Sequence, residues 1–234
     1  MKIDVEKCVR CQSCVAYCPV EAIKVSEKLY IDQETCVECG ACLKSGACKF
    51  DALYQPGLSW PRVLRGHFSD PLESHPLTGI SGRGTCEMKT NDVTGRFRDG
   101  EVGFALELGR PGISASFADL EKVFMALAGR VVFEPLNPVT GLLDIKTGRL
   151  KDARIGSERV LSAIIECKTT EDRGLEILDI LKRVAEEIDT VFSVCVVNKC
   201  RGYEIPFKKT LEEAGYIPRI NGKTNVGLGR PLVE

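Results

Sequence analysis

The sequence lacks the usual features of membrane-spanning, secreted and nucleic-acid-binding proteins. In its 234 residues, no apolar run approaches the roughly 18 residues that a membrane-spanning helix needs. The first seven residues, M-K-I-D-V-E-K, contain no apolar signal segment. The formal net charge is −1, so no broad electrostatic attraction to nucleic acid or to a membrane is expected. We therefore expect a soluble, cytoplasmic protein that binds neither.

Histidine is scarce, and two common cofactor-binding patterns are missing. His67 and His75 are the only histidines, and neither has a metal-like spacing to carboxylates or thiols. We expect both to be structural or solvent-facing. The glycines from Gly79 to Gly84 lack the G-x-G-x-x-G order of a dinucleotide-binding loop, although their backbone N–H groups could bind an anion. No flavin motif is recognisable, so a flavin on this chain is not supported.

Cysteine, in contrast, is abundant, and eight of the 12 cysteines form two similar runs. The runs are Cys8, Cys11, Cys14 and Cys18, then Cys36, Cys39, Cys42 and Cys48. Each close triplet can wrap its thiolates around one face of an iron–sulfur cubane, while a fourth thiolate comes from elsewhere. Structural zinc usually takes two C-x2-C pairs separated by a longer loop, which fits these triplets poorly. A disulfide framework would need an oxidising compartment. The spacing therefore predicts [4Fe-4S] clusters.

The duplication extends beyond the cysteines. The string I-D-x-E-x-C-V at 3–9 recurs 28 residues later at 31–37. Residues 1–54 resemble the two-cluster bacterial ferredoxins, in which two β-hairpins and two short helices form a pseudo-twofold module. In that pattern the fourth cysteine of each run ligates the other run's cluster. The crossed assignment gives cluster 1 as Cys8, Cys11, Cys14 and Cys48, and cluster 2 as Cys36, Cys39, Cys42 and Cys18.

Two departures from the ferredoxin pattern lie in the second run. Five residues, rather than three, separate Cys42 from Cys48, and Lys49 replaces the usual proline. We expect the two additional residues to loop out beside the cluster that Cys48 completes. A cationic Lys49 nearby would stabilise the reduced cluster, because reduction adds negative charge. Exposed low-potential clusters are oxygen-labile, so a low-oxygen, anaerobic setting is expected.

Residues 55–100 differ in composition from the segments on either side. They carry four prolines, seven glycines, the only tryptophan and both histidines. We expect no long regular elements there, and long irregular segments are often functional. Cys86 follows the glycine-rich string and is the one remaining cysteine considered for reactivity, although a structural role is favoured. Cys167 and Cys195 lie in apolar, strand-like runs, where buried thiols are common, and Cys200 completes the set.

Periodic patterns become clear in residues 101–234. The pattern predicts a half-buried strand at 102–108, a helix after Ser116 with a capping box to Asp119, and a strand at 130–134. A second set follows: a strand at 160–167, a helix from Thr170 with an apolar stripe at 177–188, and a strand at 191–197. A last helix starts at Pro206 and stops at Gly215; its predicted buried side chains are Phe207, Leu211 and Ala214. These two strand–helix–strand repeats predict an α+β sandwich, with the helices on one face of a mixed sheet.

A polar string also occurs twice. K-T-N-x3-G-R occupies 89–96 and again 223–230. Two such loops facing each other would offer cationic and amide donors to a carboxylate, a phosphate or a cyclic amide. The predicted ligand-binding side chains are Lys89, Asn91, Arg96, Lys223, Asn225 and Arg230. The alternative is duplicated turn chemistry without a ligand, in which the arginines pair with acidic neighbours such as Glu107 and Glu166.

The segments 87–96, 103–112 and 221–231, which contain these strings, resemble the 6-hydroxynicotinate reductase-like iron–sulfur proteins. The resemblance covers most of residues 75–234 and implies ferredoxin-dependent reduction of a hydroxylated pyridine ring. The sequence thus indicates an electron-transfer component of an iron–sulfur oxidoreductase that acts on a small cyclic or anionic ligand. The alternative is a non-catalytic electron carrier whose C-terminal domain docks onto a partner redox enzyme. Both hypotheses include a redox partner protein.

Overall fold

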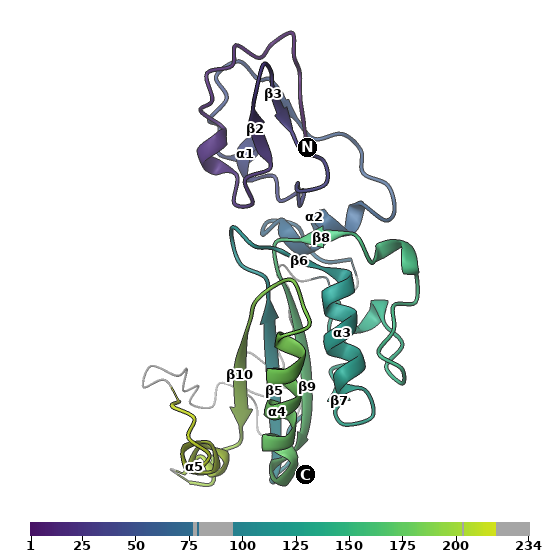
Figure 1. The fold of residues 1–234 in the computed structure, drawn as a ribbon, viewed down its shortest axis with the longest axis vertical. Helices are drawn as coiled ribbons and strands as arrows, with labels where there is room; N and C mark the ends of the chain where they lie inside the picture. Colours follow the sequence, from purple (N-terminus) through teal and green to yellow (C-terminus); the bar gives the residue numbers. More distant parts are fainter. Residues whose placement is uncertain (77–78, 80–95, 203, 219–234) are drawn as a thin grey trace.

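The computed structural model describes residues 1–76, 79, 96–202 and 204–218. Two parts lie along the long axis of the molecule, with helix α2 (Val63–Ser69) between them (Figure 1). Residues 1–54 form the upper part, and residues from 101 onward form a larger domain that contains both helices and strands. In the described part of the chain, no helix is long and apolar enough to cross a membrane.

The upper part is built from short elements. In chain order these are β1 (Lys2–Ile3), the 3-10 helix η1 (Val15–Tyr17), β2 (Ile23–Val25), β3 (Leu29–Ile31), α1 (Ala41–Lys44) and β4 (Leu53–Tyr54). Strand β1 pairs antiparallel with β4, and β2 with β3. Their inward side chains join the cysteines in one small core that includes Val20, Ile23 and Leu53. So few apolar side chains offer limited burial, which makes an additional stabilising group at the cysteines physically reasonable.

The duplication is also visible in the backbone. Left-handed backbone conformations recur at equivalent positions of the two halves: Arg10 with Glu38, Gln12 with Gly40, and Glu21 with Asp51. Outside glycine this region of φ is uncommon and costs roughly 1–2 kcal/mol per residue. Its repetition in both halves indicates that the bends are required by the fold of each cysteine loop.

One side of the α2 segment packs against the larger domain, and its other side contacts the upper part. Leu64 and Phe68 belong to the core of the larger domain, and the Phe68 ring packs edge-on against Phe117 at 5.5 Å. Arg62 and Arg65 of the same segment point the other way, to residues of the upper part. The segment 55–100 therefore contains one buried two-turn helix, and both parts of the molecule contact it.

The larger domain holds the remaining elements. In chain order they are β5 (Glu101–Leu108), β6 (Ala115–Ser116), α3 (Phe117–Leu127), β7 (Val132–Phe133), η3 (Thr140–Leu142), η4 (Ala153–Ile155), β8 (Arg159–Val160), β9 (Ala163–Thr170), η5 (Glu171–Arg173), α4 (Gly174–Ala185), β10 (Phe192–Asn198) and α5 (Pro206–Glu213). Four strands form the main sheet in the order β10-β5-β9-β7, and every neighbouring pair is antiparallel.

The antiparallel sheet corrects the prediction of a mixed sheet. Strands β5 and β7, which flank α3, run in the same direction, but β9 lies between them. Strands β9 and β10, which flank α4, are likewise parallel and separated by β5. Each strand–helix–strand unit thus inserts its first strand between the two strands of the other, a split βαβ arrangement. Only antiparallel neighbours result.

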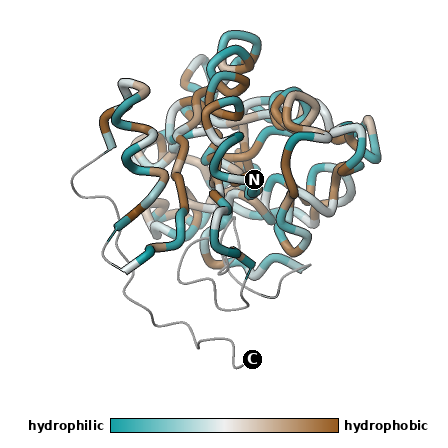
Figure 2. Tube along the Cα trace, turned by 90° about the horizontal axis from the view of Figure 1, so that it is seen from below, coloured by the Kyte–Doolittle hydropathy of each residue, from teal (hydrophilic) through white to brown (hydrophobic). Residues whose placement is uncertain are grey.

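Helices α3 and α4 pack over one face of this sheet. Alternate β5 side chains, Val102, Phe104, Leu106 and Leu108, lie in one core with both helices. Hydrophobic stretches alternate with hydrophilic ones along the chain (Figure 2). The capping box at Ser116 and Asp119 is confirmed, as is the buried stripe of α4 at Ile177, Leu181 and Val184. Strand β5 is not half-buried as predicted, because Ala105, on its opposite face, is also buried.

Several boundaries and burial predictions were wrong for identifiable reasons. The strand predicted at 160–167 is two strands, β8 and β9, separated at Leu161 and Ser162. A 3-10 turn follows Thr170, and α4 begins only at Gly174. Cys167 is buried but Cys195 is exposed, because Cys195 lies on the outer strand β10 of the described sheet and on the face away from the helices. Ala214 is exposed at the end of α5, whose buried side chains are Phe207 and Leu211.

Candidate iron–sulfur centres

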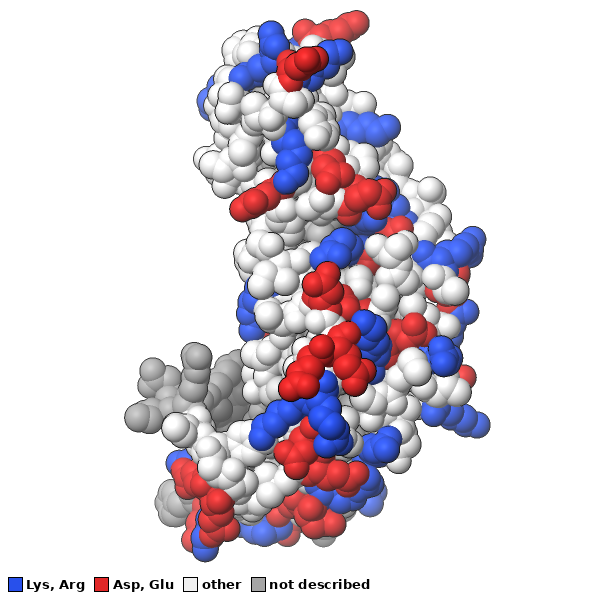
Figure 3. Space-filling model, in the orientation of Figure 1, with Lys and Arg blue, Asp and Glu red and all other residues white. Residues whose placement is uncertain are grey.

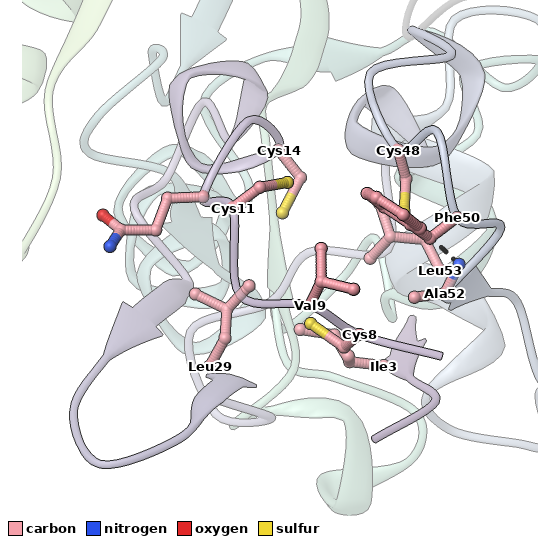
Figure 4. A pocket seen from close by; sticks show the side chains of 11 residues that line it. Ile3, Cys8, Val9, Cys11, Cys14, Leu29, Cys48, Phe50, Ala52 and Leu53 are labelled. Atoms are coloured by element: carbon pink, nitrogen blue, oxygen red, sulfur yellow. Dashed lines mark hydrogen bonds between the residues drawn. The ribbon is translucent and has the colours of Figure 1, made fainter. Parts of the chain in front are cut away.

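The first cavity lies among four cysteines of the upper part. Cys8, Cys11, Cys14 and Cys48 line it together with apolar side chains that include Val9 and Phe50. Figure 4 shows the four thiols around this space, with Cys48 approaching from a segment separate from the other three. The loop 8–14 brings three sulfurs to one side, and the chain returns at Cys48 to supply the fourth. These are the four cysteines that crossed ligation assigns to cluster 1.

The second cavity repeats the first. Cys18, Cys36, Cys39 and Cys42 line it, and they are the four cysteines assigned to cluster 2. Each of the 11 residues that line the first cavity has an equivalent, by the sequence repeat, in the lining of the second cavity. Pro19 lines the second cavity in addition. Ile3 corresponds to Ile31, for example, and Ala52 to Ala22. The pseudo-symmetry therefore extends from the thiols to the apolar side chains around them.

The spacing of the thiols bears on which group they could hold. Among the described residues, no three histidine, cysteine or acidic side chains are arranged to hold a single metal ion. A structural zinc ion needs four ligands about 2.0–2.3 Å from one point. A cubane of four irons and four sulfides spreads its ligating thiolates over a wider shell. The four thiols and the apolar lining of each cavity are compatible with an iron–sulfur cubane.

Hydrogen bonds reach three of the thiols. The backbone N–H of Ala22 donates to Cys18 Sγ at 3.1 Å, and that of Ala52 donates to Cys48 Sγ at 3.3 Å, again at equivalent positions. The Ser13 hydroxyl also donates to Cys11 Sγ at 3.4 Å and lowers the pKa of that thiol. Donors at ligating sulfurs stabilise negative charge and thereby raise the reduction potential of a cluster. Ala41 occupies the position equivalent to Ser13, so the second half lacks this side-chain donor.

Burial raises the pKa of thiols in the second set, whereas the Ser13 hydrogen bond lowers the pKa of Cys11 in the first. Burial raises the pKa of Cys36 and Cys39, and it raises the pKa of Cys42 to about 12, where the neighbouring thiols add to the effect. A thiolate is disfavoured in such a place unless a positive charge accompanies it. Iron supplies that charge, because thiolates bound to a metal are deprotonated. The donor set and its surroundings therefore fit an iron–sulfur cluster.

The second cavity also borders the larger domain. Arg65 is 3% exposed, and its Nη1 donates to the carbonyl oxygens of Gln33, Glu34 and Cys36 at 2.8–3.0 Å. Its Nε pairs with the carboxylate of Glu158, in the larger domain. One buried guanidinium thus links the cysteine loop of cluster 2 to the rest of the chain. Sequence reasoning missed Arg65, because no local pattern distinguishes it from a surface arginine.

The two departures in the second run lie at the surface. Ser45 and Gly46, in the longer spacer before Cys48, are exposed, and Gly46 has a positive φ of 64°. Lys49 is also exposed, at the position equivalent to Pro19. The spacer therefore forms an exposed turn after α1, and the thiol of Cys48 still reaches the first cavity.

Most of the predicted ligand-binding side chains lie outside the described residues. These are Lys89, Asn91, Lys223, Asn225 and Arg230, together with Cys86. Arg96 is described, and it forms an ion pair of 3.2 Å with Glu134. Glu107 pairs with Arg110 at 3.7 Å. The Arg96 ion pair agrees with the alternative in which the arginines of these strings pair with acidic side chains. Its partner is Glu134, however, and neither Glu107 nor Glu166.

Comparison with known proteins adds one finding. Residues 1–24 match the family described as a 4Fe-4S binding domain, and this segment contains the whole first cysteine run. No curated protein and no solved structure matches the chain. The resemblance of the larger domain to 6-hydroxynicotinate reductase-like proteins gains no support from these comparisons. The match implies [4Fe-4S] cluster binding and supports an iron–sulfur electron carrier.

Proposed function

We propose that the chain carries two [4Fe-4S] clusters, with the crossed ligation given above, and transfers electrons one at a time. The observation that carries this proposal is the pair of cavities, each lined by one crossed set of four cysteines and by equivalent apolar side chains. Apolar walls limit water at the sulfurs, and hydrogen bonds at Cys18 and Cys48 adjust the charge that each cluster can hold.

Chemical analysis tests the cluster content directly. Anaerobically purified protein should contain about eight iron and eight sulfide per chain, and dithionite should reduce two centres detectable by electron paramagnetic resonance (EPR). A content near four, or bound zinc, contradicts the proposal. Cys48→Ser should damage the cluster held by Cys8, Cys11 and Cys14. The matched variant Cys18→Ser should damage the other cluster. Loss of the sequence-neighbouring cluster in either case would refute the crossing.

We further propose that the protein is the electron-transfer component of a ferredoxin-type oxidoreductase. Its substrate would be an N-heterocyclic compound similar to 6-hydroxynicotinate, bound at the two K-T-N loops. The buried link from Cys36 through Arg65 to Glu158 supports this, because it fixes the larger domain beside one cluster. The competing proposal is a carrier whose larger domain only docks onto a partner enzyme.

An anaerobic assay with reduced viologen and 6-hydroxynicotinate distinguishes the two proposals. Substrate-dependent viologen oxidation, weakened by Lys223→Met without any change in the iron–sulfur spectrum, supports the oxidoreductase. No turnover with this compound or with related rings, together with tight binding to a flavoenzyme, supports the carrier. A Lys223→Met variant that lost its clusters would show that the loop supports the fold, and the ligand assignment would then fail.

A further inference from the structure

The two halves of the cysteine module are packed alike inside but covered differently outside. Ala22 and Ile23 in one half, and Ala52 and Leu53 in the other, are all buried to a similar degree. The alanine and aliphatic side chains at this inner side therefore do not distinguish the two halves. The following inference rests on the proposed function, because it concerns how electrons reach the clusters from outside the molecule.

Equivalent side chains at the outer wall of each cavity differ sharply in exposure. Val9 is 55% exposed, whereas its equivalent, Val37, is 1% exposed. Phe50 is 48% exposed, whereas its equivalent, Val20, is 7% exposed. All four side chains line their own cavity. The same outer wall is therefore sealed at cluster 2 and open at cluster 1.

Residues outside the cysteine module lie beside the cluster 2 wall. The guanidinium of Arg65 lies on the Cys36 carbonyl next to Val37. On the other side, Leu161 of the larger domain packs against the module core, and the Gly112 N–H donates to the carbonyl of Pro19, next to Val20. The equivalent wall at cluster 2 thus lies against other parts of the protein, so a wall of this kind is suited to packing against a protein surface.

Among the described residues, no segment beyond residue 54 is recorded in contact with the cluster 1 wall. Within the described residues, the hydrogen bonds and ion pairs of the first cavity's lining stay inside residues 1–54. Val9 and Phe50 both line the first cavity (Figure 4), and Lys7, Arg10 and Asp51 are exposed beside them in sequence. Much of the visible face of the upper part is uncharged, whereas charges of both signs crowd the larger domain (Figure 3).

We propose that this open wall, formed by Val9 and Phe50 over cluster 1, is the docking surface for a separate one-electron redox protein. An apolar centre with charges around it is the usual anatomy of a protein interface. Transient redox interfaces are small, below about 1,200 Å², so one cavity wall with its surroundings is a sufficient area. The occupant needs a flat, largely uncharged surface above its own redox centre. Cluster 2, covered by the larger domain, then exchanges electrons only within the molecule.

A stopped-flow experiment on the holoprotein tests the docking surface. The probe is a small flavoprotein in its anionic hydroquinone form, and dithionite is the small-molecule reductant. One electron passes from the hydroquinone, which becomes the neutral semiquinone, to a cluster, which goes from the 2+ to the 1+ state. The variants are Val9→Asp and Val9→Lys, with Phe50→Lys as a second site on the same wall. Ile145→Asp and Ile145→Lys are matched controls, because Ile145 is 56% exposed on the larger domain.

Both Val9 variants should reduce the second-order rate constant with the flavoprotein at least tenfold, because either charge must be desolvated in an apolar contact. Dithionite should still reduce both clusters of each variant completely, which shows that the clusters are present, and both Ile145 variants should match the unmodified protein in both reactions. Acceleration by one charge and slowing by the other would indicate electrostatic steering alone and overturn the inference. Unchanged rates with the flavoprotein would also overturn it.

The proposed two-cluster function and the proposed docking surface can be refuted independently of each other. If the purified protein lacks two reducible clusters, the proposed function fails before any docking is measured. If both clusters are present and dithionite reduces them, but Val9 and Phe50 variants accept electrons from the flavoprotein normally, only the docking surface is refuted. Should a Val9 variant lose a cluster, Phe50→Lys provides the decisive measurement.

Discussion

Replacing Arg65 by methionine removes a buried cation that connects the Cys36 loop with the larger domain. Methionine keeps much of the side-chain volume, but it leaves the carboxylate of Glu158 and the carbonyls of Gln33, Glu34 and Cys36 without this donor. Removing one partner of a buried ion pair typically destabilises a protein by about 3–5 kcal/mol. For a chain of this size, 1 kcal/mol corresponds to about 2–4 °C, so the midpoint of thermal unfolding should fall by roughly 6–20 °C.

The assay is anaerobic thermal unfolding followed by circular dichroism, with EPR of the dithionite-reduced protein to identify which cluster is lost first. Cluster 2 should be lost first, because Arg65 contacts its loop. The double variant Arg65→Met/Glu158→Met should be more stable than Arg65→Met alone, since no buried carboxylate is left unpaired. The control is Arg154→Met, which breaks an exposed pair with Asp152 and should change the midpoint little. A shift for Arg65→Met as small as that of the control, or strictly additive effects in the double variant, would refute the reasoning.

Three further outcomes are expected. Ser13→Ala should make the reduction potential of cluster 1 more negative in protein-film voltammetry, because a hydrogen bond to a ligating sulfur is lost. Gly40→Ala should lower the free energy of unfolding by about 1–2 kcal/mol, since Gly40 has a φ of 70°, whereas Gln12→Gly at the equivalent position should be neutral or stabilising. Burial, with His67 nearby, lowers the pKa of His75 to about 4, so the unfolded chain binds more protons as pH falls from 6.5 to 4. The free energy of unfolding of the natural protein, measured by denaturant titration, should therefore fall by about 2 kcal/mol between pH 7 and pH 5. The His75→Phe variant should lack this loss, and an equal loss in both proteins would contradict the reasoning.

The spacing of the cysteines and the local patterns of the helices could be recognised in the sequence, because both depend on residues close together in the chain. The capping box of Ser116 and Asp119 spans one turn, and the stripe from Ile177 to Val184 follows the helical period. The two cavities bring together the cysteines that the resemblance to two-cluster ferredoxins assigned to each cluster. In the helices a few neighbouring residues carry the whole signal, whereas the crossed cysteine sets were expected only from the resemblance to two-cluster ferredoxins.

Long-range arrangement could not be recognised in this way. Alternation along β5 predicts a buried face, but it does not reveal that β9 rather than β7 is its neighbour. The apolar run around Cys195 suggested burial, whereas the period of a strand puts that thiol on the face away from the helices. Arg65 gave no signal at all, because its partners lie about 30 and 93 residues away in the sequence. Such contacts arise only when the parts of the chain assemble.

The unequal covering of two nearly equal halves has its origin in a few small residues. Gly109 has a φ of 80°, and a Cβ at this position would lie 2.7 Å from the carbonyl oxygen of Leu161. Only glycine lets the loop that contains Gly112 approach so closely, and this loop and Leu161 together reach the wall of cluster 2. There the wall residue is the small Val20, where the other half has the larger Phe50. Substitution of Gly109 by a larger residue would therefore have to move Leu161, which would expose more of the cluster 2 side and reduce the difference in exposure on which the proposed docking at cluster 1 rests.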